Sequence, residues 1–462
     1  MKVSCRKLFC LPLACLFVLT ACAQGTGAST DAASTEPVPI EVPPPVEQTN
    51  TELNIWYTDY DMTELYLDAA VNQYNLQHPD HPVTAEKYFA DGSAESDEEA
   101  TQQMLTEVMA GSGPDLIFFD VGNMDIEKMV RRGVFADLEP YFEADNFDWS
   151  GYNQAVMDAG VWDGQRLVIP LEYNFPMLYT SQTALDETGF SIENCDTFSG
   201  LLDEIEAMQA DPSQTRDVFR TKFTFYDFAH YAGISYVDYD RQKADLSSPE
   251  LKRGAEIYNN LSGLDLPILD DGINGAADIR DGKVLWSCPF PPVNGFYTGP
   301  EVINTFDDMI MMPIRDVDGG IQAEITWAVA VRNNSPNLQN AYEFIKYLLS
   351  EEYHLETLGY RWLYYSVLDS ANEANFQETV YNRTTPLIPS AGRDYGFENA
   401  DVHPEDFDEL MDYTRQITGA YFSCAETNFM RNMRMCGFLS GEAAYDDAVE
   451  DAERQMNLYL SE

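Results

Sequence analysis

The stretch from Leu105 to Asp120 reads LTEVMAGSGPDLIFFD and decides the fold class. It begins inside a segment of about residues 97–110 whose apolar side chains have helical spacing, which predicts a helix. Gly111-Ser112-Gly113 predicts the end of that helix, because glycine readily adopts the backbone conformation that closes one. The four apolar residues 116–119 then predict a strand covered on both faces, as in a parallel sheet. A helix that leads directly into such a strand predicts an α/β lobe.

Strands and helices alternate on both sides of this stretch. Before it, we predict strands over residues 53–57 and 83–89 and a helix over residues 65–74. After it, we predict helices over residues 126–132, 198–208, 249–261, 338–349 and 443–460, and strands over 167–169, 284–287 and 325–331. Residues 170–179 show little periodicity, and we interpret them as a first crossing of the chain between two lobes.

The first residues predict export. A basic start precedes an apolar run from Leu8 to Leu19, which is shorter than the ~20 residues that a membrane span needs, so residues 1–21 predict a signal peptide. The run ends in Leu19-Thr20-Ala21-Cys22, which resembles a lipobox, where the peptide is cut and the cysteine receives a lipid. We predict lipidation of Cys22 and attachment to the outer leaflet of the cytoplasmic membrane, facing outside. An ordinary signal peptide that contains a cysteine is the alternative.

Residues 22–51 predict a flexible tether. They are mostly Ala, Ser, Thr, Glu and Pro, including the run Pro43-Pro44-Pro45. Such a segment cannot bury enough apolar surface to offset the entropy lost on ordering. The lipid would then hold a folded domain away from the membrane. No later run of sequence predicts a transmembrane helix.

The net charge argues against two classes of binding partner. The formal net charge is −51, and so anionic a protein is unsuited to nucleic acid or to anionic lipid. We therefore expect no nucleic acid as a partner, and membrane contact through the lipid anchor only. Residues 52–462 are too many for one compact core and suit two lobes. We expect a monomer.

The cysteines and acidic turns give no sign of a cofactor. After the signal peptide and Cys22, only Cys195, Cys288, Cys424 and Cys436 remain, and whether they form disulfides stays open. None of these four cysteines forms a close pair in the sequence and no histidine lies near them, so we predict no metal and no cofactor. Residues 316–320, DVDGG, predict a turn, with bound calcium as the alternative. The serine-nucleophile, zinc-protease and Walker motifs are missing, and we predict no catalytic residue.

Four stretches occur in an order typical of one family. They are AGSGPD at 110–115 followed by GVFADL at 133–138; residues 169–179; WAVAV at 327–331 with the helix to 349; and LSGEAA at 439–444 with the last helix. In that order, behind a lipobox and a tether, they resemble the maltose-binding-like family of extracellular solute-binding proteins. Residues 194–281 and 368–404 match the family pattern poorly.

The resemblance implies an α/β, two-lobed, periplasmic-binding-protein-like fold with discontinuous lobes and a hinge. It assigns residues 52–169 and about 290–345 to the N-terminal lobe, and residues 170–289 and about 346–462 to the C-terminal lobe. It implies the substrate-binding lipoprotein of an ABC importer, which captures an extracellular small-molecule solute in the cleft and delivers it to the permease transmembrane subunits. Ligands of open α/β sheets do bind beyond the carboxyl ends of strands, and hinge closure is a common response to them.

A carbohydrate, a sugar or oligosaccharide, is the solute that the resemblance implies. Peptides and other polar solutes stay open. Aromatic rings and hydrogen-bonding side chains suit a sugar. The candidates that follow predicted strands or lie at crossings are Trp56, Tyr57, Asp59, Asp120, Asn123, Glu172, Tyr173, Asn174, Trp286, Trp327, Trp362 and Tyr364.

Each candidate has a structural alternative. Core packing is the alternative for the tryptophans and for Tyr364, and helix capping for Asp59 and Asp120. The aromatic residues between Phe223 and Tyr231 are interpreted as core. Two other functions stay open for the whole chain: a secreted glycoside hydrolase lipoprotein, because carboxylates are abundant, and a surface binding protein without a transport role.

Overall fold

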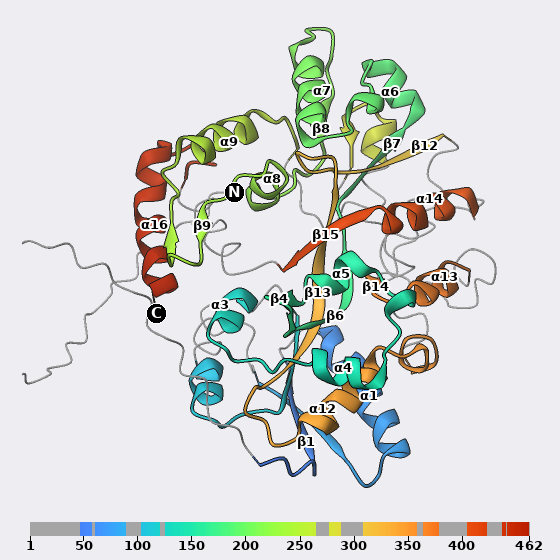
Figure 1. Cartoon of the computed structure of the whole chain (residues 1–462). Coiled ribbons are helices and arrows are strands. Elements are labelled where there is room, and N and C mark those ends of the chain that lie inside the picture. The colour runs from blue at the N-terminus through green and yellow to red at the C-terminus, as the bar shows by residue number, and fades with distance from the viewer. Residues whose placement is uncertain are drawn as a thin grey trace, which may run out of the picture. The chain divides into compact units, whose positions relative to one another are not determined.

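A mixed sheet of seven strands organises the first lobe within the described residues. The structure is a computed structural model that describes residues 47–57, 61–88, 103–120, 125–264, 277–287, 308–357, 364–377, 404–422, 437–439 and 441–461. The strand order is β14-β6-β13-β3-β1-β2, with β15 paired to β13 (Figure 1). The strands are β1 (Leu53–Tyr57), β2 (Val83–Lys87), β3 (Leu116–Asp120), β6 (Ile169–Asn174), β13 (Ile321–Val331), β14 (Tyr365–Ser366) and β15 (Ile417–Phe422).

The parallel part of this sheet is where the sequence predicted it. β1 pairs in parallel with both β2 and β3, and the apolar residues 116–119 of β3 are completely buried. β13 is antiparallel to β3 and to β6, so the sheet as a whole is mixed. The predicted strand 325–331 is the second half of β13, which starts earlier, at Ile321.

Helices and short elements surround this sheet. α1 and α12 pack against one another, and α5 packs on β6 and β15. The bounds are α1 (Asp61–Gln77), α3 (Ile126–Arg131), α4 (Glu139–Asp145), η2 (Trp149–Gly151), α5 (Gln154–Asp158), β4 (Val161–Trp162), β5 (Gln165–Arg166), α12 (Leu338–Leu348), η5 (Glu352–Thr357), α13 (Asp369–Gln377) and α14 (Pro404–Arg415). Among the described residues, no helix has the length and apolar character needed to cross a membrane.

Two short sheets organise the second lobe. β7 is antiparallel to β12, β8 is parallel to β11, and a bridge between Tyr179 and Ser287 connects the two pairs. The elements are β7 (Met177–Ser181), α6 (Gln182–Thr188), η3 (Ile192–Asn194), α7 (Phe198–Ala210), β8 (Asp217–Phe219), α8 (Phe225–Tyr231), β9 (Val237–Asp238), β10 (Lys243–Ala244), α9 (Pro249–Asn260), β11 (Val284–Trp286), β12 (Met309–Pro313) and α16 (Tyr445–Ser461).

Serine and threonine caps fix where the helices of the second lobe begin. Ser181, Thr197, Thr224 and Ser248 each accept a hydrogen bond from a backbone N–H in the first turn of α6, α7, α8 and α9. Each cap satisfies an N–H group that a helix start would otherwise leave unpaired. The turn predicted at residues 316–320 also forms, because the Asp316 carboxylate accepts from the N–H groups of Asp318 and Gly320.

The first crossing consists of two buried strands, β6 and β7, joined by Phe175 and Pro176. All residues of both strands are buried, so apolar and polar side chains do not alternate and the sequence shows no period. The lobe boundaries stay a prediction, but two pairings bear on them. β12, expected in the first lobe, pairs with β7, and β14, expected in the second, pairs with β6.

The end of the predicted tether is part of the fold. Gln48 accepts a hydrogen bond from Leu338 N–H at 3.0 Å and Asn50 accepts one from Gln339 N–H at 3.2 Å. These two side chains cap the start of α12. The residue at the N-cap position, Asn337, makes no side-chain hydrogen bond to the first turn of the helix. Asn337 instead binds Thr51 N–H and the buried Asp115 carboxylate. Residues 48–51 are therefore docked, and the predicted tether before residue 47 lies outside the described residues.

Replacing both capping side chains tests this docking. The double variant Gln48→Ala with Asn50→Ala should lower the free energy of unfolding by about 1 to 2 kcal/mol, because two N–H groups of α12 lose their acceptors. Chemical denaturation measures the difference. Exposed Glu47→Ala is the control and should leave stability unchanged. An unchanged double variant would show that water replaces these caps at no cost.

Candidate functional site

The first-lobe sheet brings three predicted site residues into one row. Trp327 of β13 lies opposite Asp120 of β3 on one side and opposite Glu172 of β6 on the other. Tyr57, another predicted residue, ends the neighbouring strand β1 and lies opposite Phe118. The carboxyl ends of β1 and β3 therefore meet the middle of β13, where an open α/β sheet places its ligands.

Two side chains of this row are buried. Trp327 is 4% exposed, and its ring centre lies 4.7 Å from that of Tyr66. Glu172 is 2% exposed and lies near Tyr353, whose pKa is raised well above its usual value by burial and then by the Glu172 charge. The structure thus packs Trp327 in the core, which was its structural alternative. Glu172 lies below the surface of the crossing.

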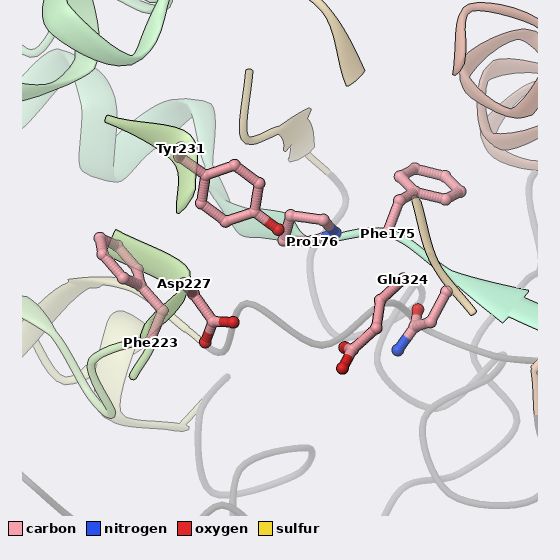
Figure 2. Close-up of a pocket in the computed structure, with 7 residues that line it drawn as sticks. Phe175, Pro176, Phe223, Asp227, Tyr231 and Glu324 are labelled. Atoms are coloured by element: carbon pink, nitrogen blue, oxygen red, sulfur yellow. The ribbon is translucent and has the colours of Figure 1, made fainter. Parts of the chain in front are cut away.

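A hollow lies next to this row, where the crossing strands meet α8. Asn174, Phe175 and Pro176 come from the first crossing, Glu324 from β13, and Phe223, Asp227 and Tyr231 from α8 and the residues before it. Glu324 and Asn174 are opposite one another in the β13–β6 register. Figure 2 shows the side chains of Asp227 and Tyr231, both from α8, and that of Glu324, from β13, around the same space.

The local sequence explains how Asp227 is held. Thr224 and Asp227 form a capping box, in which Asp227 N–H donates to the Thr224 hydroxyl at 3.1 Å and Thr224 N–H donates to the Asp227 carboxylate at 3.0 Å. A carboxylate in the first turn is also stabilised by the helix dipole. The capping box therefore fixes the Asp227 carboxyl group at the rim of the hollow.

The hollow is electrostatically negative. Burial raises the pKa of Tyr231 well above its usual value, and the Asp227 and Glu324 charges raise it further. Burial likewise raises the pKa of Tyr421, with Tyr231, Glu324 and Asp227 adding to the effect. The two phenol oxygens lie 3.5 Å apart. Both tyrosines are neutral at ordinary pH and can donate or accept hydrogen bonds.

Asn174 supplies an amide to the same space. It is 5% exposed, and its side-chain oxygen has no hydrogen-bond partner among the residues described. Such a buried acceptor is costly unless a partner arrives, and a ligand hydroxyl can be that partner. Carboxylates, an amide and phenols beside aromatic rings form a surface that suits a polar, ring-containing solute.

The volume of the hollow limits the size of the solute that it can hold in this arrangement of the lobes. Water-sized groups can occupy only about 30 Å³ of it. Pockets for small ligands usually hold roughly 300 to 1,000 Å³. A solute larger than a few water molecules therefore requires the lobes to move apart.

The family of the chain follows from its similarity to known proteins. The model of the bacterial extracellular solute-binding protein family matches residues 69–384, which is more than half of the chain. The chain belongs to this family. The resemblance found in the sequence is thereby confirmed. A comparison with curated protein sequences finds no match.

Solved structures agree on the fold of this solute-binding protein. The sugar-binding protein MalE from Xanthomonas citri aligns with a TM-score of 0.56 at 13% identity, covering 89% of this chain and 98% of that one. The cyclic alpha-maltosyl-1,6-maltose binding protein from Arthrobacter globiformis aligns with a TM-score of 0.54 at 18% identity, covering 90% and 99%. The fold is therefore the two-lobed α/β fold that the sequence predicted.

A third structure of the same fold contains a bound carbohydrate. The ABC substrate-binding protein Lmo0181 from Listeria monocytogenes, in complex with cycloalternan, aligns with a TM-score of 0.51 at 15% identity, covering 89% of this chain and 99% of that one. At such identities the likeness shows the fold alone.

The remaining predicted residues are half-buried, fully buried or outside the described residues. Trp56 is half-buried and stacks on Tyr88 with ring centres 4.3 Å apart. Tyr173 is buried and stacks on Tyr365 at 5.6 Å, and Tyr364 is half-buried just before β14. Trp286 has no exposed surface and packs edge-on against Phe190. Asp59, Asn123, Trp362, Cys22 and the side chain of Asp120 lie outside what the structure describes.

Sequence reasoning missed most of the hollow. Only Asn174 was among its predicted residues. Phe223 and Tyr231 were interpreted as core and are indeed buried, but they also line the hollow. Asp227 and Glu324 were not singled out. Two signals could have pointed to them. Thr224-x-x-Asp227 is a capping-box pattern, and Glu324 is the one charged residue of the segment that forms β13.

Trp286→Ala separates core packing from ligand contact. Removing this fully buried ring should lower the free energy of unfolding by about 3 to 5 kcal/mol, because a large cavity remains. Denaturation of the ligand-free protein measures the loss. The half-buried Trp56→Ala is the comparison and should lose less. Weakened solute binding with full stability would instead make Trp286 the ligand contact that the sequence predicted.

Proposed function

We propose that this protein is the substrate-binding lipoprotein of an ABC importer, which captures a carbohydrate between its lobes and delivers it to the permease transmembrane subunits. The observation that carries the proposal is the hollow at the first crossing, where Asn174, Asp227, Tyr231 and Glu324 converge from both lobes. Family membership supports solute binding. Proteins of the same fold bind cycloalternan, cyclic alpha-maltosyl-1,6-maltose or mannotriose, which supports a sugar as the solute.

Each group in the hollow has a role in the proposed complex. The carboxylates of Asp227 and Glu324 accept hydrogen bonds from sugar hydroxyls, and such charge-assisted bonds are the stronger ones. The Asn174 oxygen accepts another. The rings of Phe223 and Tyr231 contact the apolar face of a pyranose. Glu172, two strand positions before Asn174 and on the same face of β6, would contact the solute once the lobes separate.

Glu324→Gln tests the site. In a panel of neutral mono- and oligosaccharides, the unchanged protein should bind at least one sugar, seen as a thermal shift and by calorimetry. Glu324→Gln keeps the shape and removes the charge, so Kd should rise by roughly 10-fold or more, the loss of one charged hydrogen bond. Exposed Glu250→Gln, in the first turn of α9, is the matched control and should bind normally.

The sugar panel, together with an assay of permease stimulation, separates this proposal from the two alternative functions. A glycoside hydrolase would release products from an oligosaccharide, whereas a binding protein leaves the sugars unchanged. A surface binding protein without a transport role would bind in the hollow but would not stimulate a permease. A panel in which no sugar binds, with peptides and other polar solutes binding instead, would overturn the carbohydrate assignment.

The proposed anchor is a lipid on Cys22, which lies outside the described residues. Cys22→Ala should move the protein from the membrane fraction to the soluble fraction, because the tether and the folded part supply no other anchor in this proposal. Immunoblotting of the two fractions measures the change. Cys195→Ala is the control. Cys195 is a buried free thiol, and burial raises its pKa to about 12. It is not the proposed lipid site, so the Cys195→Ala variant should stay in the membrane fraction. A Cys22→Ala variant that also stays there would refute the lipid anchor.

A further inference from the structure

A set of contacts joins the two lobes outside the strands that cross between them. α16 belongs to the second lobe, where Asn457 accepts a hydrogen bond from Ala244 N–H at 2.8 Å and the Tyr445 hydroxyl donates to Leu246 O at 2.7 Å. Its last turn nevertheless reaches α3 of the first lobe. The Tyr459 hydroxyl donates to the Asp125 carboxylate at 2.9 Å. Figure 1 shows this end of α16, in red, beside α3.

Lys128 of α3 completes the contact. Its ammonium group donates to the Tyr459 carbonyl at 2.8 Å and lies 3.7 Å from the centre of the Tyr459 ring. Lys128 is 7% exposed and Asp125 is 3% exposed, so both charges are buried where the lobes meet. A buried ammonium needs compensating contacts, and Tyr459 provides a carbonyl and an aromatic face.

A second contact lies one helical turn away. Arg131 of α3 forms an ion pair with Asp240 and lies over the ring of Tyr239, both in the turn between β9 and β10 of the second lobe. The Asp240 side chain is 84% exposed, so this pair adds little energy by itself. It extends the same contact between α3 and the second lobe.

We propose that these residues are a lobe latch: Asp125, Lys128 and Arg131 of α3, with Tyr459 and Asp240 of the second lobe, hold the lobes together and set the balance between open and closed states. The inference rests on the proposed function, since closure is what would retain the solute. Opening replaces the Tyr459 contacts with water around Lys128 and Asp125. The net difference is therefore small, and both states can be populated.

The test uses two matched pairs of variants. Single-molecule energy transfer between dyes at exposed positions 80 and 206, one in each lobe, reports the ratio of open to closed molecules without added solute. The mature chain carries Cys22→Ala to keep it free of lipid. Tyr459→Phe removes one interlobe hydrogen bond and should raise the open-to-closed ratio about two- to tenfold. Tyr445→Phe, in the same helix, removes a bond within one lobe and should leave the ratio unchanged.

The second pair addresses the exposed ion pair. Arg131→Gln should raise the ratio in the same direction but by less than Tyr459→Phe. Arg241→Gln, which breaks an ion pair with Asp238 inside the same turn, should not. A Tyr459→Phe ratio equal to that of Tyr445→Phe would overturn the latch. Because no sugar is present, a failed sugar panel leaves this result intact, and a failed latch leaves the sugar site intact.

Discussion

The fold depends on the hydrogen bonding of β13 along both of its edges. This strand of 11 residues pairs with β15 near its start, with β6 through its middle and with β3 at its end. A long strand with both edges paired leaves few backbone groups to be satisfied elsewhere, so its position is strongly determined. Its side chains alternate in exposure near Ile321 and become fully buried towards Val331. Glu324 lies in the alternating half, at the hollow.

The hollow combines rigid and movable parts. Asn174 and Glu324 are fixed by the β6–β13 register, whereas Asp227 and Tyr231 are carried by α8 of the second lobe. Relative motion of the lobes therefore changes the distance between the two halves of the site without disturbing either half. Acceptors already oriented by a register and by a capping box lose little entropy when a solute binds.

Two groups of buried polar residues in the first lobe make different contacts. Asp115 accepts hydrogen bonds from Ser335, Asn337 and the backbone of Asn54 at 2.6, 3.0 and 3.0 Å, which joins the starts of β1, β3 and α12 inside one lobe. Asp125 and Lys128 instead bind a residue of the other lobe. The first network is satisfied in any arrangement of the lobes. The second is satisfied only when they meet.

The sequence by itself determined the α/β class, the helix before Gly111, the buried strand after it, α12, α16 and the family, because each is written in local periodicity, caps or motif order. It could not show β6 and β7, since burial of both faces removes the period. It correctly placed Tyr231 in the core, but it did not show that Tyr231 also lines the hollow, and it missed Glu324 there. Only the tertiary structure decided which distant residues meet, because strand register and lobe packing join residues far apart in the chain, and no local pattern records that contact.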